Sequence, residues 1–166
     1  MIFLIFENID YNYMLKKNKV VHTTSENPDF IFLYNTFDTF LWERYPELKT
    51  DYWGNNVIEF NPNVVILYLN DRPVGCGCFK KYSETAAELK RMFVLPEVRG
   101  LGIAQQIIKE VESKAIEQGF KMLILETLYK QLEAINLYQK MGFEIIENYE
   151  PYIGLTNSIC MSKNII

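Results

Sequence analysis

A six-residue segment near the middle of the chain has the residue types expected of a turn that binds an anion. Arg99-Gly100-Leu101-Gly102-Ile103-Ala104 follows an apolar stretch that stops at Pro96, and it opens a stretch with helical periodicity. A helix N-terminus leaves backbone N–H groups unpaired and carries a partial positive charge. The two glycines let an anion reach these N–H groups without a Cβ in the way, and the small Ala104 permits close packing of the helix. The segment is therefore predicted to bind phosphate; the alternative is a strand-to-helix turn that uses glycine only for tightness.

The common nucleotide-binding motifs do not describe this segment. It lacks the third glycine of G-x-G-x-x-G, and Ile103-Ala104 stand where a P-loop has Lys and then Ser or Thr. Gly75-Cys76-Gly77-Cys78 lies inside a predicted strand and opens no helix. We assign that second glycine-containing segment no nucleotide role.

The cysteines and the single histidine predict neither a disulfide framework nor a metal site. Cys76, Cys78 and Cys160 are odd in number, and His22 is the one histidine of the sequence. Cys76 and Cys78 are two residues apart in an apolar segment, so they share one face of a strand. We interpret the three as buried thiols of a protein in a reduced cytoplasm.

The elements around the predicted phosphate-binding loop alternate between strand and helix periodicity. Turn residues and apolar spacing predict the order β-α-β-β-β-α-β-α-β-β, a mixed sheet in an α/β layered domain. The predicted strands are residues 19–25, 64–69, 74–80, 87–95, 122–125, 143–146 and 158–162, and the predicted helices are residues 28–45, 103–118 and 134–141. Residues 47–62 are rich in loop-forming residues and contain no predicted element.

Length and charge exclude several classes of protein. The 166 residues fit a single domain, residues 1–166, and 49% hydrophobic with 23% charged residues is an ordinary globular composition. A net charge of −4 argues against a general nucleic-acid binder, because neutralising phosphates needs a basic surface. The apolar run at residues 1–6 is far shorter than the roughly 20 residues of a membrane span, and it lacks the basic flank of a signal peptide. We therefore expect no nucleic-acid partner and no membrane partner.

Three linked motifs resemble the GNAT-type N-acetyltransferase superfamily. The loop from Arg99 to Ala104 matches the family's acyl-CoA loop, Gln/Arg-x-x-Gly-x-Gly/Ala. Met92-Phe93-Val94-x-Pro96 precedes it and Ala134-x-x-Leu137-Tyr138-x-x-x-Gly142-Phe143 follows it, in the family's order and separation. The resemblance is strong over residues 64–147 and weak before residue 60. It implies a single domain with a mixed, mostly antiparallel sheet of about seven strands, helices on both faces, and a β-splay, a gap between two strands, that holds acyl-CoA.

The resemblance also implies acetyl-CoA as co-substrate, no metal, and a set of cofactor contacts. The pantetheine arm would pair with backbone groups of Met92 and Val94, and the Val94 amide would polarise the thioester carbonyl. The pyrophosphate would lie on the amides of Arg99, Gly100, Leu101, Gly102, Ile103 and Ala104. The Arg99 side chain either adds a charge contact to phosphate or is a solvated loop arginine. Gln131 stands where many members have a cofactor-binding asparagine, and Asn136 on the same helix is the other candidate for that contact.

The reaction that the resemblance implies is direct transfer of an acetyl group to an amine, with Glu88 as the base. Strand alternation places Glu88 on one face with Lys90, Met92 and Val94. The separation of Glu88 from Val94 indicates proton removal through a bridging water. The alternative is a surface carboxylate paired with Lys90 or Lys81.

Tyr138 is the predicted acid, at a position where the family commonly has a tyrosine near the coenzyme A sulfur. A phenol with an unperturbed pKa of about 10 is protonated at neutral pH and can protonate the leaving thiolate. The alternative for Tyr138 is a packing role on the apolar face of its helix. None of the three cysteines matches a nucleophile motif.

The resemblance also implies that the acceptor enters opposite the cofactor, at residues 37–56 and 148–157, which are rich in aromatic and acidic residues. The aromatic residues are Trp42, Tyr45, Tyr52, Trp53, Tyr149 and Tyr152, and the acids are Asp38, Glu43, Glu47, Asp51 and Glu150. A pocket of this composition favours a cationic amine, on a small molecule or a peptide; alternatively, the aromatics cover the sheet and the acids face water. Two other functions stay open, a non-catalytic acyl-CoA-binding module and a transferase that uses another acyl-CoA donor. A homodimer is compatible with the family, and the sequence does not decide the oligomeric state.

Overall fold

The computed structural model describes residues 18–48 and 59–166. The apolar run at residues 1–6 and the predicted acceptor-side residues Asp51, Tyr52 and Trp53 lie outside these ranges. Within the described ranges, no helix has both the length and the apolar character needed to cross a membrane.

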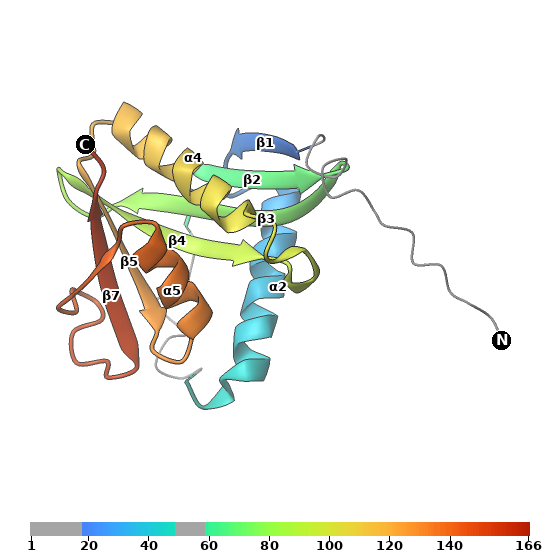
Figure 1. Cartoon of the computed structure of the whole chain (residues 1–166). Helices are drawn as coiled ribbons and strands as arrows, with labels where there is room; N and C mark the ends of the chain where they lie inside the picture. The colour runs from blue at the N-terminus through green and yellow to red at the C-terminus, as the bar shows by residue number, and fades with distance from the viewer. Residues whose placement is uncertain (1–17, 49–58) are drawn as a thin grey trace.

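A seven-stranded sheet forms the centre of the molecule (Figure 1). Its strands lie in the order β1-β2-β3-β4-β5-β7-β6, and every neighbouring pair is antiparallel except β4 and β5. The strands are β1 (Asn18–Thr23), β2 (Val64–Leu69), β3 (Arg72–Lys81), β4 (Ala86–Val94), β5 (Met122–Leu128), β6 (Glu144–Ile146) and β7 (Ser158–Asn164). The predicted order of elements and the mixed, mostly antiparallel sheet are confirmed.

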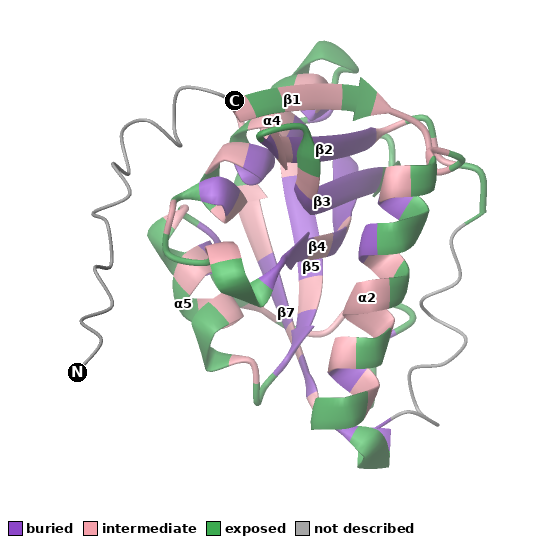
Figure 2. Cartoon of the chain, turned by 90° about the vertical axis from the view of Figure 1, so that its right-hand side faces the viewer, coloured by how far each residue is buried: buried purple, intermediate pink, exposed green. Residues whose placement is uncertain are grey.

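Helices cover both faces of the sheet, as predicted. The helix α2 (Pro28–Arg44) lies on one face, and α4 (Ile103–Glu117) and α5 (Leu132–Lys140) lie on the other (Figures 1 and 2). Two short 3-10 helices, η1 (Pro46–Leu48) and η3 (Pro96–Val98), follow α2 and β4. The N-terminus of α2 is fixed by Asn27, whose side chain accepts a hydrogen bond of 2.9 Å from the Asp29 N–H, with proline as the next residue after the cap.

Close packing of α4 on β3 explains the two glycines of that strand. A Cβ atom at Gly75 or at Gly77 would lie 2.9 Å from the side chain of Ile107, which is fully buried. The strand therefore uses glycine to let the helix approach, which is a packing reason and not a nucleotide-binding one. Cys76 and Cys78, on the same strand, are buried free thiols as predicted, and so is Cys160.

The parallel strands β4 and β5 pair only at their beginnings. Their register runs from Ala86 opposite Met122 to Glu88 opposite Ile124, although β4 continues to Val94 and β5 to Leu128. Beyond these pairs the two strands separate (Figure 1). This opening is the predicted splay.

A β-bulge lies in the part of β4 that borders the splay. Lys90 and Phe93 are three residues apart, but their partners on β3, Cys78 and Cys76, are only two apart. Arg91, inside this interval, has φ of 56°, a left-handed conformation that recurs in bulges of this kind. One extra residue is therefore inserted into β4.

The bulge overturns the predicted alternation of side chains along β4. Cross-strand partners share a face of the sheet, so Lys90 and Phe93 lie on the same face, together with Glu88 two residues before Lys90. Met92 and Val94 then lie on the opposite face. The prediction that Glu88 shares its face with Met92 and Val94 is wrong, because counting alternate residues takes no account of an inserted one.

Candidate active site

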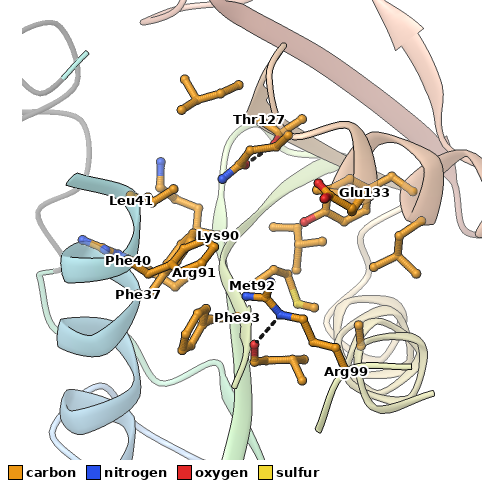
Figure 3. Close-up of a pocket in the computed structure, with 18 of the residues that line it drawn as sticks. Phe37, Phe40, Leu41, Lys90, Arg91, Met92, Phe93, Arg99, Thr127 and Glu133 are labelled. Atoms are coloured by element: carbon orange, nitrogen blue, oxygen red, sulfur yellow. Dashed lines mark hydrogen bonds between the residues drawn. The ribbon is translucent and has the colours of Figure 1, made fainter. Parts of the chain in front are cut away.

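A cavity of about 380 Å³ lies where β4 and β5 separate (Figure 3). Its walls come from α2, β4, the loop after β4, the start of α4, the end of β5 and α5, with Tyr152 from the segment before β7. The predicted site residues that line it are Glu88, Met92, Val94, Arg99, Gly100, Gly102, Ile103, Ala104 and Tyr138. Leu101 is in the same loop but is not one of its lining residues. The fold thus brings the predicted cofactor loop and both predicted catalytic residues to one cavity.

The predicted phosphate-binding loop adopts a conformation that requires glycine at two positions. Gly100 has φ of 81° and Gly102, the N-cap of α4, has φ of 79°. Side chains other than glycine rarely adopt these left-handed angles. The first helical hydrogen bond runs from the Gln106 N–H to the Gly102 carbonyl, so the preceding N–H groups of α4 have no helical acceptor. Ile103 and Ala104, which carry two of these N–H groups, line the cavity.

Backbone groups of β4 alternate between β3 and the cavity. The Leu95 N–H donates to the Val74 carbonyl of β3 at 2.9 Å. The backbone groups of Val94, and of Met92 two residues earlier, then point to the other side, where β5 has separated from β4. These are the groups for which a cofactor contact is predicted.

The side chain of Arg99 contacts β4 and α2 and is not simply solvated. Its Nε donates a hydrogen bond of 3.0 Å to the Val94 carbonyl, shown as a dashed line in Figure 3, and its guanidinium lies 4.9 Å from the ring centroid of Phe40 on α2. This bond uses one of the two lone pairs of the Val94 carbonyl, so a ligand can still pair with the same carbonyl.

Glu88 is buried, with 2% of its surface exposed, at the centre of a polar cluster. Its Oε1 accepts hydrogen bonds from the hydroxyls of Tyr149 and Tyr152, at 3.2 and 3.1 Å. The ammonium groups of Lys80 and Lys90 each lie 3.5 Å from its carboxylate oxygens. The predicted alternative of a surface carboxylate is therefore wrong, although one of its two expected lysine partners, Lys90, is present.

Burial shifts the pKa values of the groups around Glu88. It raises the pKa of Tyr149 and of Tyr152 far above the ordinary phenol value, and the neighbouring carboxylate of Glu88 raises both further. Burial also lowers the pKa of Lys90, against the attraction of Glu88. The Lys90 ammonium donates to the Tyr152 hydroxyl at 2.9 Å. Both phenols consequently stay protonated and act as hydrogen-bond donors to the carboxylate.

Tyr138 lies on α5 and lines the cavity, with 7% of its surface exposed. Its ring meets Phe143 edge to face, with centroids 5.6 Å apart, so the side chain both packs and borders the cavity. Burial raises its pKa well above the ordinary value, and the charge of Glu126 adds to the shift. Tyr138 is therefore protonated throughout the neutral range. At the start of the same helix, Gln131 also lines the cavity, and its Oε1 accepts a hydrogen bond of 2.7 Å from Thr127.

Glu126 on β5 is a cavity-lining carboxylate that the sequence analysis did not identify. Its Oε1 accepts a hydrogen bond of 2.7 Å from the Ser158 hydroxyl. Burial raises its pKa to about 7, against the lowering effects of Ser158 and Lys90. The predicted strand ended at Leu125, where the continuous apolar run stops, whereas β5 continues to Leu128. A single glutamate followed by Thr127 and Leu128 inside an apolar stretch was the signal available in the sequence.

We expect replacement of Glu126 by glutamine to remove a pH-dependent loss of stability. The Glu126 carboxyl stays protonated up to about pH 7 in the folded chain, but only up to its ordinary pKa of 4.5 in the unfolded chain. The folded state therefore binds more protons between these pH values, and the wild-type free energy of unfolding falls as the pH rises. One pKa unit corresponds to 1.36 kcal/mol. Between pH 5 and pH 8, the free energy of unfolding of E126Q should therefore rise relative to that of the wild type by about 2 to 3 kcal/mol. Urea denaturation of both proteins across this range measures it. A difference that does not change with pH would contradict the raised pKa.

Aromatic residues of α2 form the wall of the cavity on the other side of the splay. Phe37, Phe40, Leu41 and Trp42 line it, and Phe37 stacks on Phe93 of β4 with centroids 5.1 Å apart. Of the aromatic residues predicted for the acceptor side, Trp42 and Tyr152 line the cavity.

Two of the acids predicted for the acceptor side are held in ion pairs. Asp38 contacts the Arg91 guanidinium, and Glu47 pairs with Lys130 at 2.6 Å. Neither acid is among the residues that line the cavity.

The fold and the cavity together define a class of protein. A mostly antiparallel sheet opens at the pair β4 and β5, and a loop with two left-handed glycines and a helix N-terminus border the opening. This is the architecture of acyl-CoA-dependent N-acyltransferases. The chain belongs to the Acetyltransferase (GNAT) family, whose model matches residues 27–143. The family predicted from the three motifs is confirmed.

Two curated relatives are similar over the central part of the chain. One is named IAA acetyltransferase, from Azospirillum brasilense, and is 39% identical over 91 residues, which cover 54% of this chain and 60% of the relative. The other is the uncharacterized N-acetyltransferase YjgM of Escherichia coli, 43% identical over 107 residues, which cover 64% of this chain and 59% of the relative. The chain thus spans about 60% of the length of these relatives.

Solved structures share the fold at lower sequence identity. An acetyltransferase of the GNAT family from Staphylococcus aureus superposes with a TM-score of 0.68 at 17% identity, covering 90% of this chain and 99% of the other. A GNAT family acetyltransferase from Elizabethkingia anophelis, crystallised with acetyl-CoA bound, superposes with a TM-score of 0.54 at 21% identity, covering 61% and 74%.

Proposed function

We propose that this protein is an acetyl-CoA-dependent N-acetyltransferase that moves the acetyl group to a primary amine by direct attack. The observation that carries the proposal is the cavity at the splay. It joins the glycine-bordered N-terminus of α4, the β4 backbone at Val94 and the hydroxyl-bearing Tyr138 in one space. Family membership and the acetyl-CoA held by the Elizabethkingia structure support the same donor.

In this proposal the loop after β4 holds the pyrophosphate of the donor. The amides from Arg99 to Ala104 supply N–H donors at the positive end of α4. Left-handed φ at Gly100 and Gly102, with no other atom within 4 Å of a Cβ built there, leaves room for phosphate oxygens close to the backbone. The pantetheine arm pairs with the backbone of Met92 and Val94 in place of β5.

The chemistry requires a neutral amine, a polarised thioester carbonyl and a proton for the departing thiolate. The Val94 N–H polarises the carbonyl oxygen, on which negative charge develops as the amine attacks. The C–N bond forms, the C–S bond breaks, and the Tyr138 hydroxyl donates a hydrogen bond and then its proton to the sulfur. The proton that the amine loses passes to a carboxylate of the cavity wall, for which the sequence predicts Glu88.

The acceptor enters, in this proposal, from the side of α2. The aromatic wall of Phe37, Phe40 and Trp42 supports a small-molecule or peptide amine that carries apolar groups. The ion pairs of Asp38 and Glu47 give no support to the part of the prediction that relied on those acids to attract a cationic amine.

An acetyl-CoA thiol-release assay across a panel of amines tests the proposal. The panel contains free amino acids, polyamines, arylalkylamines and short peptides with a free N-terminus, each with acetyl-CoA and with propionyl-CoA as donor. We expect release to depend on both protein and amine. Acetyl-CoA binding by calorimetry without amine-dependent release would favour the non-catalytic acyl-CoA-binding module, and preference for propionyl-CoA would favour another donor.

A further inference from the structure

Two carboxylates, the buried Glu88 and the half-buried Glu126, face the same part of the cavity. In the parallel register of β4 and β5, Glu88 lies opposite Ile124. Glu126 follows Ile124 by two residues, so it lies on the same face of the sheet as Glu88 and Lys90. It is also beyond the last paired residues of β5, where the two strands have separated. Both carboxylates line the cavity.

The carboxylate of Glu88 is already surrounded by donors. Two tyrosine hydroxyls donate to its Oε1, and two lysine ammonium groups lie at 3.5 Å, one at each oxygen. Together these contacts hold the carboxylate in one orientation and leave little room for a hydrogen bond from an incoming amine. The arrangement fits a positioning role for Glu88.

The carboxylate of Glu126 has a different environment. The Ser158 hydroxyl donates to its Oε1 at 2.7 Å and holds that oxygen in place. The side chain lines the cavity. Burial opposes its charge, and the nearby carboxylate of Glu88 opposes it further. Both effects favour proton uptake close to neutral pH.

We propose that Glu126, and not Glu88, accepts the proton of the attacking amine. The proposal rests on the proposed acetyl transfer and names its base. As the amine nitrogen bonds to the acetyl carbon, one N–H proton passes to the Glu126 carboxylate, which becomes a neutral carboxylic acid. The thiolate leaves with the proton of Tyr138. Glu126 afterwards returns its proton to solvent and Tyr138 takes one proton from solvent, so both groups regain their starting state and no net proton is gained or lost. Glu88 is a positioning residue that keeps Lys90, Tyr149 and Tyr152 in place around the acceptor side.

The titration of Glu126 depends on groups from every element packed around it. They are Glu88 and Lys90 on β4, Tyr138 on α5, Tyr152 before β7, and Ser158 and Cys160 on β7. Of these, the ammonium of Lys90 lowers the pKa of Glu126 together with the Ser158 hydroxyl, and Glu88 raises it. Tyr138, Tyr152 and Cys160 are uncharged near neutral pH because burial raises the pKa of each.

The test compares the pH dependence of thiol release for wild type, E126Q and E88Q with the best amine of the panel. The matched control is E144Q, a glutamate on β6 that pairs with β7 but is exposed and outside the cavity. The free amine has the same pKa in every assay, so a difference between the pH–rate profiles of two variants arises from a group of the protein. We expect wild type and E144Q to gain activity through an enzyme group with a midpoint near pH 7. We expect E88Q to show the same group at a lower midpoint, because the charge of Glu88 raises the pKa of Glu126. We expect E126Q to lack that limb and to lose about 100-fold in kcat/KM at pH 8.

A second measurement does not depend on turnover. With ¹³C in the glutamate carboxyl groups, the resonance absent from E126Q should titrate near pH 7 in the wild type. The assignment is overturned if E126Q keeps the rise in activity near pH 7, or if only E88Q loses it. It is also overturned if the Glu126 resonance titrates with a midpoint near pH 4.5. Wild-type protein that releases no thiol with any amine overturns the proposed function instead, and the assignment with it.

Discussion

Replacing Gly102 by valine is expected to weaken acetyl-CoA binding about 100-fold while the domain stays folded. Gly102 caps α4 with φ of 79°, and a β-branched residue strongly disfavours this left-handed conformation. The backbone has to rotate at the point where the N–H groups of Ile103 and Ala104 border the cavity. Losing the alignment of a charge-assisted hydrogen bond costs about 1.5 to 3 kcal/mol, which is enough to account for the expected loss of affinity.

The control for this variant is Gly119→Val at the other end of the same helix. Gly119 also has a left-handed φ, of 87°, and also has no atom within 4 Å of a Cβ built on it, but it does not line the cavity. Both variants should lose similar stability in thermal denaturation, because the backbone strain is alike. Calorimetric titration with acetyl-CoA should then separate them. Equal affinity of G102V and G119V would show that the loop does not hold the pyrophosphate.

Replacing Tyr138 by phenylalanine is expected to lower kcat by about 100- to 1,000-fold and to leave the affinity for acetyl-CoA within about threefold. The substitution removes only the hydroxyl, so the edge-to-face contact with Phe143 persists. Without the hydroxyl, the sulfur leaves with its negative charge uncompensated by a proton donor. Steady-state thiol release gives kcat, and calorimetry gives the affinity.

Tyr68→Phe is the matched control for the loss of a phenol. The Tyr68 hydroxyl donates to Asp29 at 2.6 Å, between β2 and α2, and Tyr68 does not line the cavity. Y68F should cost about 1 kcal/mol of stability and leave kcat unchanged. If Y138F retained the turnover of Y68F, Tyr138 would have only the packing role that its position on α5 also allows.

Much of the architecture was predictable because it depends on properties that act over a few residues. The apolar spacing of Ile103, Ile107 and Val111 predicts the buried face of α4, and all three are buried. The start of α2 follows from Asn27 and Pro28, whose capping roles are local. The glycines at 100 and 102 indicate a left-handed turn before a helix, and both have left-handed φ.

The environment of the two carboxylates was not predictable in the same way. Glu88 is buried by hydroxyls of Tyr149 and Tyr152, which are more than 60 residues away in the chain. Glu126 lies beyond the apolar run that predicted its strand, so that run gave it no role. In both cases the decisive quantity is the number of atoms and charges around the group, which depends on how strands and segments far apart in the chain pack together.

The amino-acid sequence by itself determined the order of strands and helices, the family, and the loop from Arg99 to Ala104 as the predicted phosphate site, because glycine conformation, capping and hydrophobic periodicity are local. Only the tertiary structure decided on which face of the sheet each side chain of β4 lies, since the bulge at Arg91 exchanges the faces of all later residues. It also decided that Arg99 bonds the Val94 carbonyl and that Glu126 faces the splay. These features depend on strand register and on contacts between segments that are distant in the chain. The same contacts remove Glu126 from water and thereby raise its pKa.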